Sequence, residues 1–233
     1  MKTIGLLGGM SWESTLSYYQ SINQGVKTQL GGLHSAKIAL YSVDFAQIEQ
    51  LQHQGDWQQT AEILAQAAKG VQAAGADCLL ICTNTMHKVA EQIQAQISIP
   101  ILHIADATAE QLVADNIGKV GLLGTAFTME QDFYKQRLVE NYGIEVLVPD
   151  VQQRQRVHQI IYTQLCLGVI KDQSRDEYLQ IIDDLYQRGA QAVILGCTEI
   201  ALLISPSDTD VPLYDTTAIH AQKAVEFALS EDT

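Results

Sequence analysis

The sequence predicts an α/β protein built from two similar halves, each a parallel sheet with helices on both faces. Short apolar runs alternate with helical stretches along the whole chain, which is typical of this class. An internal repeat supports two halves, because three blocks recur in the same order. Residues 4–8 match 120–124 (120 − 4 = 116), 75–76 match 189–190 (189 − 75 = 114), and 99–102 match 211–214 (211 − 99 = 112).

The elements follow from apolar runs and the glycines that end them. In the first half we expect strands at 4–7, 37–45, 76–82 and 99–103, and helices at 14–27, 55–74, 84–96 and after 103. The second half restarts at Lys119, with strands at 119–124, 145–148 and 192–195 and helices at 129–142, 152–167, 175–188 and 217–230. We expect one domain at 1–103 plus about 213–233, and a second at about 104–212.

Composition excludes several classes of protein. The formal net charge of −13 argues against a nucleic-acid or anionic-membrane surface. No apolar run approaches 18 residues, and the N-terminus reads as a strand and not as a signal peptide. We therefore expect a cytoplasmic protein in which the four cysteines are free thiols. Cys78 and Cys82 have no second pair to complete a zinc site, so we expect no metal.

Polar motifs follow the predicted strands, where ligands bind in parallel sheets. They are 8–11 (Gly-Gly-Met-Ser), 83–85 (Thr-Asn-Thr), 124–125 (Gly-Thr) and 197–199 (Cys-Thr-Glu). We expect them to line a cleft between the halves. Asn84 and Thr198 are expected to open helices whose N-termini hold a carboxylate, although simple helix capping would need no ligand.

The repeat places Thr83 opposite Cys197, one from each half, which suits moving a proton on or off carbon. A helix N-terminus is expected to lower the pKa of the Cys197 thiol. Because side chains alternate along a strand, Thr83 and Cys82 point to opposite faces, with Cys82 toward the packed helices. A bulge would reverse this, so Cys82 stays an alternative. Among the histidines, His87 is the first candidate for a role beyond packing.

Cofactor signatures are missing from the sequence. Residues 5–9 lack the Gly-x-Gly-x-x-Gly pattern of dinucleotide sites, and there is no P-loop. No lysine lies in a context that indicates pyridoxal phosphate. We therefore expect no cofactor.

Three motifs together resemble the aspartate/glutamate racemase family: Gly-Gly-Met-Ser-Trp-Glu-Ser-Thr at 8–15, Thr-Asn-Thr-Met-His at 83–87 and Gly-Cys-Thr-Glu at 196–199. The resemblance covers essentially the whole chain. It implies two α/β domains related by a pseudo-twofold, a cofactor-free site between them and usually a homodimer. In that family two cysteines flank Cα, and the usual first motif is Cys-Asn-Thr. Here Thr83 stands in the cysteine position, a variant similar to the broad-specificity or L-aspartate/glutamate-specific branch.

The expected function is amino-acid racemisation by proton removal and return at Cα. Cys197 is the main base and acid, and Thr83 serves the opposite face weakly or through water. Gln52 resembles a substrate-contacting position, and its amide favours broad specificity or a weak acidic preference, while Lys171 and Arg175 are candidate cations from the other half. The expected substrate-binding residues are Met10, Gln52, Asn84, Thr85, Thr125, Thr198 and Glu199.

Two other functions fit the same residues. A relative with one cysteine can decarboxylate a malonate-type acid or isomerise a small diacid by protonating a planar intermediate on one face. A non-catalytic amino-acid sensor is also built from two α/β lobes, but it would not need a cysteine at a helix N-terminus.

Overall fold

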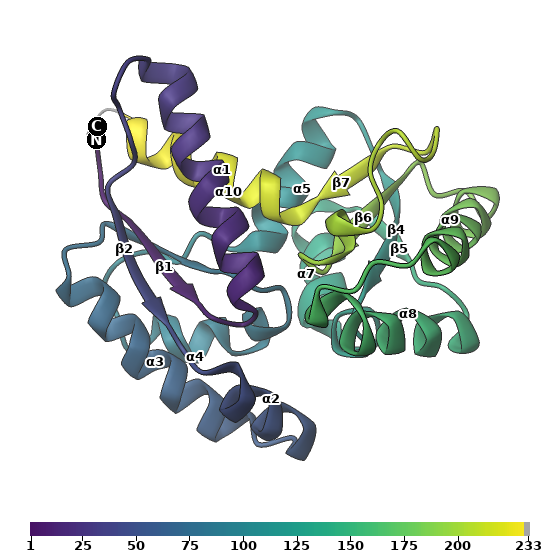
Figure 1. The fold of residues 1–233 in the computed structure, drawn as a ribbon, viewed down its shortest axis with the longest axis horizontal. Helices are drawn as coiled ribbons and strands as arrows, with labels where there is room; N and C mark the ends of the chain where they lie inside the picture. The colour runs from purple at the N-terminus through teal and green to yellow at the C-terminus, as the bar shows by residue number, and fades with distance from the viewer. Residues whose placement is uncertain (231–233) are drawn as a thin grey trace. The chain divides into compact units, whose positions relative to one another are not determined.

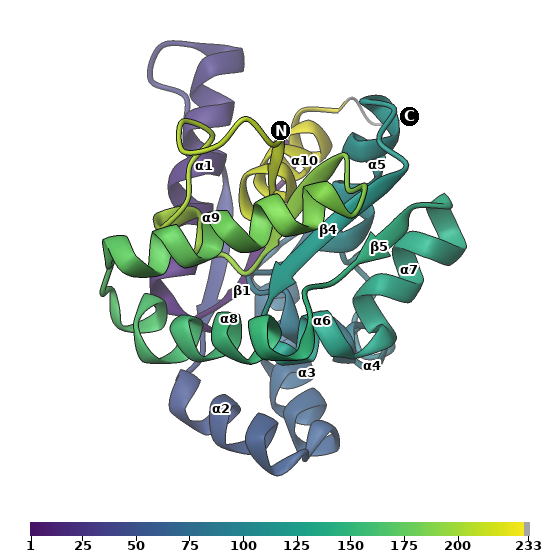
Figure 2. The same ribbon diagram turned by 90° about the vertical axis from the view of Figure 1, so that its right-hand side faces the viewer.

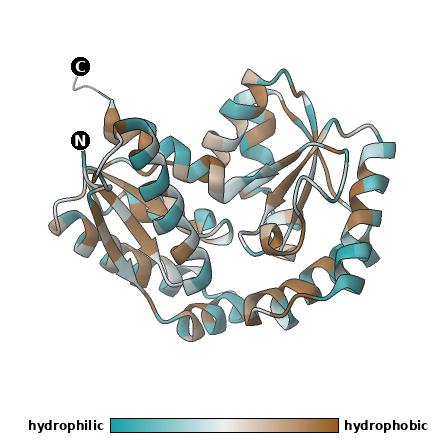
Figure 3. Ribbon diagram, turned by 45° about the horizontal axis from the view of Figure 1, so that its top comes forward, coloured by the Kyte–Doolittle hydropathy of each residue, from teal (hydrophilic) through white to brown (hydrophobic). Residues whose placement is uncertain are grey.

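The structure is a computed structural model that describes residues 1–230. The chain divides into two compact units (Figure 1). The first comprises Met1–Ile104 and the chain from Thr217 onward, and the second is Ala105–Thr216. Strands in both units are largely apolar, whereas most helices carry one apolar and one polar side (Figure 3). Among residues 1–230, no helix combines the length and apolarity needed to cross a bilayer.

A three-stranded parallel sheet forms the centre of the first unit, with strand order β2-β1-β3. The strands are β1 (Ile4–Gly8), β2 (Ile38–Ser42) and β3 (Cys78–Ile81). The helices are α1 (Trp12–Leu30), α2 (Phe45–Gln54), α3 (Trp57–Ala73), α4 (Ala90–Gln94) and α10 (Thr216–Leu229), with a 3-10 turn, η1 (Thr85–Val89).

The two faces of this sheet have separate cores, because successive side chains along a strand point to opposite sides. Leu7, Leu79 and Ile81 pack with α3 and α4. The alternate positions of β1 and β3 pack with α1 and α10, through residues such as Tyr18 and Val225. The C-terminal helix also holds the N-terminus of the chain, since the Lys2 backbone N–H donates to the Ala228 carbonyl at 2.9 Å.

The second unit has a four-stranded parallel sheet in the order β5-β4-β6-β7. Its strands are β4 (Lys119–Gly124), β5 (Glu145–Leu147), β6 (Ala192–Gly196) and β7 (Leu213–Asp215). Its helices are α5 (Ile104–Ala114), α6 (Ala126–Glu130), α7 (Asp132–Tyr142), α8 (Val151–Thr163) and α9 (Asp172–Gln187), with 3-10 turns η2 (Leu165–Leu167) and η3 (Ile200–Leu202). In Figure 2, α8 and α9 lie on one side of β4, where they bury one apolar cluster against β4 and β6.

Strand register confirms the internal repeat. The paired positions are Gly5 with Leu79 and Leu79 with Ile101 in the first unit, and Gly121 with Val193 and Val193 with Leu213 in the second. These pairs obey the offsets of 116, 114 and 112 residues found in the sequence. Each sheet therefore has the same local plan, and Thr83 and Cys197 occupy equivalent positions just beyond equivalent strands.

Several predicted boundaries are wrong, for local reasons. The strand expected at 99–103 is reduced to one bridge, between Leu79 and Ile101, and on the side away from β3 the Ile101 N–H donates to the Gln94 side chain at 2.8 Å. The strand expected at 37–45 ends at Ser42, and helix α2 follows, where Asp44 accepts from the Ala46 N–H at 3.1 Å. The helix expected at 129–142 is split at Gln131, whose backbone is extended.

Candidate active site

The backbone at Thr83 is held on several sides. The Cys82 N–H donates to Leu7 O at 2.9 Å, which continues the sheet by one residue. The Ser14 hydroxyl donates to Cys82 O at 3.0 Å. The Thr83 N–H donates to Ile81 O at 2.8 Å, which turns the chain out of the strand. Thr83 is half-buried, so its hydroxyl lies at a boundary and not in the core.

Cys82 belongs to the core, as alternation predicts. Its side chain is fully buried with Cys78 and Leu80 among residues of α1 and α10. Burial raises the pKa of the Cys82 thiol far above its usual range, so it is a poor source of thiolate. The alternative in which Cys82 replaces Thr83 therefore finds no geometric support.

The expectation that Asn84 and Thr198 cap helices is wrong. Asn84 precedes the five-residue η1, and Glu199, not Thr198, precedes the three-residue η3. Neither Asn84 nor Glu199 makes a side-chain cap hydrogen bond to the turn that follows. Such short 3-10 turns align few peptide dipoles, so they offer little of the positive end that a longer helix provides. A carboxylate at these turns would depend on individual N–H groups and side chains.

Cys197 and Glu199 form a thiol–carboxylate pair just beyond β6. The Cys197 Sγ donates to Glu199 Oε2 at 3.0 Å, and the Thr198 hydroxyl donates to the same oxygen at 2.7 Å. Burial, and then the Glu199 charge, raise the pKa of the Cys197 thiol well above its ordinary value. The predicted lowering of this pKa is therefore wrong. At neutral pH the thiol keeps its proton, with a proton acceptor in contact.

Close approach of backbone shapes the chain after β1. A Cβ on Gly8 would collide with the side chain of Thr15, and Gly9 has φ of +92°. The Gly9 N–H donates to the Thr15 hydroxyl at 2.8 Å, which ties the turn to α1. Met10, which follows, is buried and contributes to the α3-side core. Gln52 lies on the buried side of α2.

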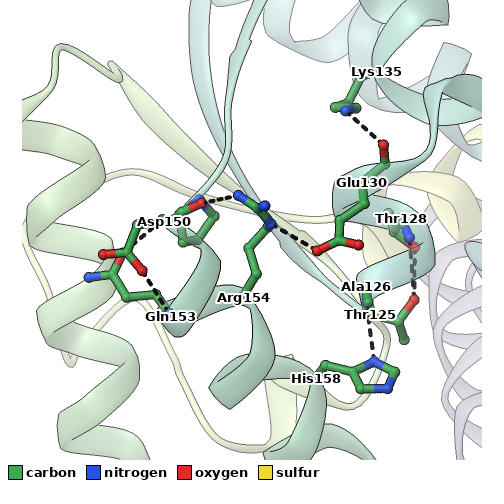
Figure 4. A network of polar contacts seen from close by, with 10 residues as sticks. Thr125, Ala126, Thr128, Glu130, Lys135, Asp150, Gln153, Arg154 and His158 are labelled. Atoms are coloured by element: carbon green, nitrogen blue, oxygen red, sulfur yellow. Dashed lines mark hydrogen bonds and ion pairs between the residues drawn. The ribbon is translucent and has the colours of Figure 1, made fainter.

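The chain after β4 carries Thr125 and a histidine that the sequence analysis did not single out. Thr125 caps α6, where its hydroxyl accepts from the Thr128 N–H at 3.4 Å (Figure 4). The His158 Nδ1 accepts from the Ala126 N–H at 3.1 Å, so α8 supports the same turn (Figure 4). No motif marks His158, because the contact joins separate helices. Nearby, Arg154 pairs with Glu130 at 3.1 Å.

The candidate cation Arg175 is engaged within its own unit. Its Nη1 contacts Asp172 at 2.6 Å and its Nε donates to Leu203 O at 3.0 Å. A distal carboxylate would have to compete with both contacts. Over the described part of the chain, no group of three or more His, Cys, Asp or Glu side chains is arranged to hold a metal ion.

Known proteins share this architecture along the whole chain. A Yersinia pestis protein solved as a candidate Asp/Glu racemase is 58% identical, with a TM-score of 0.93 over 99% of this chain and 100% of that one. An aspartate racemase homologue from Pyrococcus horikoshii is 34% identical, with a TM-score of 0.86 over 99% and 100%. The broad specificity amino-acid racemase RacX of Bacillus subtilis is 25% identical over 97% of this chain and 98% of its own length.

These relatives include amino-acid racemases, which are isomerases. The family model described as Asp/Glu/Hydantoin racemase matches residues 7–224, which include both strand-end motifs and the helices around them. The resemblance noted in the motifs thus extends to the fold, and this chain belongs to the Asp/Glu/hydantoin racemase family.

Proposed function

We propose that this chain is a cofactor-independent amino-acid racemase in which Cys197 is the main base and acid at Cα and Thr83 serves the opposite face. The observation that carries the proposal is the 3.0 Å hydrogen bond from Cys197 Sγ to Glu199 Oε2. It supplies a reactive group and a proton acceptor at one position. Family membership and the equivalence of Thr83 and Cys197 in the repeat support the same assignment.

The resting thiol is protonated, so it acts as a base only by passing its own proton on. As the Cα–H bond breaks, its proton bonds to Cys197 Sγ while the original S–H proton moves to Glu199 Oε2. The amino acid becomes a planar carbanion, with its charge spread into the α-carboxylate. In the other direction Glu199 returns its proton to sulfur as sulfur protonates Cα. Glu199 thereby keeps the buried site at constant charge.

Thr83 gives the opposite face a different chemistry. A threonine hydroxyl donates and accepts hydrogen bonds, but its alkoxide is too basic to persist near neutral pH. Thr83 therefore delivers a proton to the carbanion and recovers one from water, and Glu199 releases its proton to water to complete the cycle. The two faces are unequal, yet free enantiomers have equal energy. Because the equilibrium constant is one, kcat/KM must be equal in the two directions. The difference between the two faces can therefore appear only as different values of kcat and of KM.

The proposed substrate is aspartate, glutamate or a broader set of amino acids. The expected contacts are Met10, Gln52, Asn84, Thr85, Thr125, Thr198 and Glu199. A Gln52 amide both donates and accepts hydrogen bonds, so it discriminates weakly between a carboxylate and an uncharged side chain. The engagement of Arg175 with Asp172 and Leu203 favours the same breadth.

The test is α-proton exchange in D₂O, followed by ¹H NMR for the L and D forms of a panel of amino acids. We expect loss of the α-proton signal with appearance of the opposite enantiomer, for at least one amino acid. Carbon dioxide release from malonates without inversion would instead identify a decarboxylase. Tight binding of an amino acid with no exchange at Cα would identify a sensor. Either result would overturn the proposal.

A homodimer and a cytoplasmic location complete the proposal. Trp12, Leu16 and Tyr19 are more than half exposed on one side of α1, which supports contact with a second copy. Light scattering coupled to size exclusion should give twice the 25.6 kDa chain mass. A monomeric mass at micromolar concentration would contradict this part of the proposal.

A further inference from the structure

Both ring nitrogens of His87, in η1, have backbone partners. His87 is buried, with 4% of its surface exposed. Its Nδ1 lies 2.9 Å from Thr83 O, and its Nε2 accepts from the Ile104 N–H at 3.2 Å. The ring thus bridges the Thr83 turn and the residue where the chain leaves the first unit.

These two contacts fix the protonation of the ring. Nε2 faces a backbone N–H, so it carries no proton and acts as acceptor. Nδ1 faces a carbonyl, so it carries the proton and donates to Thr83 O. His87 is therefore neutral, in the Nδ1–H form. A proton on both nitrogens would set Nε2–H against the Ile104 N–H.

Two other histidine rings lie near the His87 ring. The His103 ring packs edge-on with a centroid distance of 4.5 Å, and the His220 ring lies at 5.8 Å. His220 is held in turn, because its Nε2 donates to Leu102 O at 2.6 Å and its Nδ1 accepts from the Tyr18 hydroxyl at 2.8 Å.

We propose that His87 is a positioning residue that holds the Thr83 carbonyl, and through it the Thr83 hydroxyl, at the start of α5. The Thr83 N–H already donates to Ile81 O, and the hydrogen bond from His87 fixes the Thr83 carbonyl as well. A β-branched side chain on a fixed backbone has few rotamers left, so its hydroxyl direction is set. This role of His87 rests on the function proposed above.

Two substitutions separate the contacts of His87. In His87→Asn the amide nitrogen lies near the place of Nδ1 and can still donate to Thr83 O. In His87→Gln the amide reaches the place of Nε2, so it can accept from the Ile104 N–H but leaves Thr83 O without its donor. Both variants lose the aromatic ring, and Asn, one methylene shorter than Gln, leaves the larger cavity, so a loss of packing alone would harm His87→Asn more than His87→Gln. His220→Gln is the control, because it disturbs a buried histidine that does not touch Thr83.

The readout is the ratio of inversion to α-proton exchange in D₂O, because a general loss of structure lowers both rates together. We expect His87→Gln to lower this ratio about tenfold, His87→Asn to change it by less than about threefold, and His220→Gln to leave it unchanged. Equal ratios in the two His87 variants would show that the ring only fills space, and would overturn the proposal.

A second readout does not depend on activity. Imidazole ¹⁵N NMR of the parent protein should show a protonated Nδ1 and a bare Nε2 at His87, and amide exchange at Thr83 should speed up in His87→Gln but not in His87→Asn. If the parent exchanges no amino acid while these signals hold, the racemase proposal fails and the positioning contact stands. An Nε2–H form of His87 would overturn the positioning contact whether or not the parent is active.

Discussion

Replacing the carboxylate next to the reactive thiol separates two roles of Glu199. Glu199→Gln keeps the shape of the side chain and an oxygen that can accept from the Thr198 hydroxyl. It removes the carboxylate that accepts the hydrogen bond from the Cys197 thiol. Glu199 also contributes to the raised pKa of the Cys197 thiol, after burial. The substitution should therefore make the thiol more acidic while it removes the proton acceptor.

The distance in the structure sets the scale of this effect. Two negative charges 3.0 Å apart repel by about 5 kcal/mol at an effective dielectric constant near 20. Thiolate and carboxylate are therefore not both charged in the resting site, and the thiol keeps its proton. A positioned general base is worth about 10²- to 10⁴-fold in rate, or about 3–5 kcal/mol of barrier. Glu199→Gln should slow α-proton exchange by this factor.

If Glu199 accepts the proton, its loss should slow exchange, whereas if Glu199 only raises the pKa of the thiol, its loss should speed exchange. The assay therefore separates the two roles. Exchange of the α-proton is followed by ¹H NMR in D₂O, and the reactivity of the Cys197 thiol is followed by alkylation and mass spectrometry across pH. We expect slower exchange together with alkylation that begins at lower pH. A variant as active as the parent, or more active, would show that Cys197 works as a free thiolate and would refute the relay through Glu199.

Three further predictions concern the opposite face of Cα, the close approach of β4 to the end of β6, and the buried His220 imidazole. Thr83→Cys should bring the kcat values of the two directions closer in steady-state assays, and no change would count against Thr83 at the substrate. Gly196→Ala would place Cβ 2.8 Å from Leu123 O, so it should destabilise by about 1–3 kcal/mol in urea unfolding, whereas Gly118→Ala, with 3.9 Å of space, should be nearly neutral. Burial lowers the pKa of His220 to about 3, so between pH 3 and its ordinary pKa of 6.5 only the unfolded chain binds this proton. The free energy of unfolding should therefore decrease as the pH is lowered below 6.5, by about 2 kcal/mol at pH 5. Urea titrations should show a smaller decrease in His220→Gln.

The repeat could be read from the sequence because it depends on spacing. The two sheets pair their strands at the offsets that the sequence gives, and this makes Thr83 the equivalent of Cys197. Alternation along β3 also predicts correctly that Cys82 joins the core between α1 and α10. Both inferences need only regular geometry, which a sequence pattern records directly.

The rest depends on three-dimensional contacts that no spacing records. The pKa of Cys197 is set by the burial of its thiol and by the side-chain direction of Glu199, two residues away, and not by the turn type. The roles of His87 and His158 come from backbone groups of Ile104 and Ala126, which are far along the chain. Helix α2 was missed because its glutamine-rich sequence has a weak apolar pattern.

In the proposed mechanism, two unequal groups serve the two faces of Cα. The most direct measurement is Thr83→Ala in D₂O, with aspartate and glutamate followed from each enantiomer separately. We predict that this variant still exchanges the α-proton of one enantiomer through Cys197 but inverts it at least tenfold more slowly than the parent. Inversion at the parent rate would contradict the claim, as would an equal loss of exchange from both enantiomers.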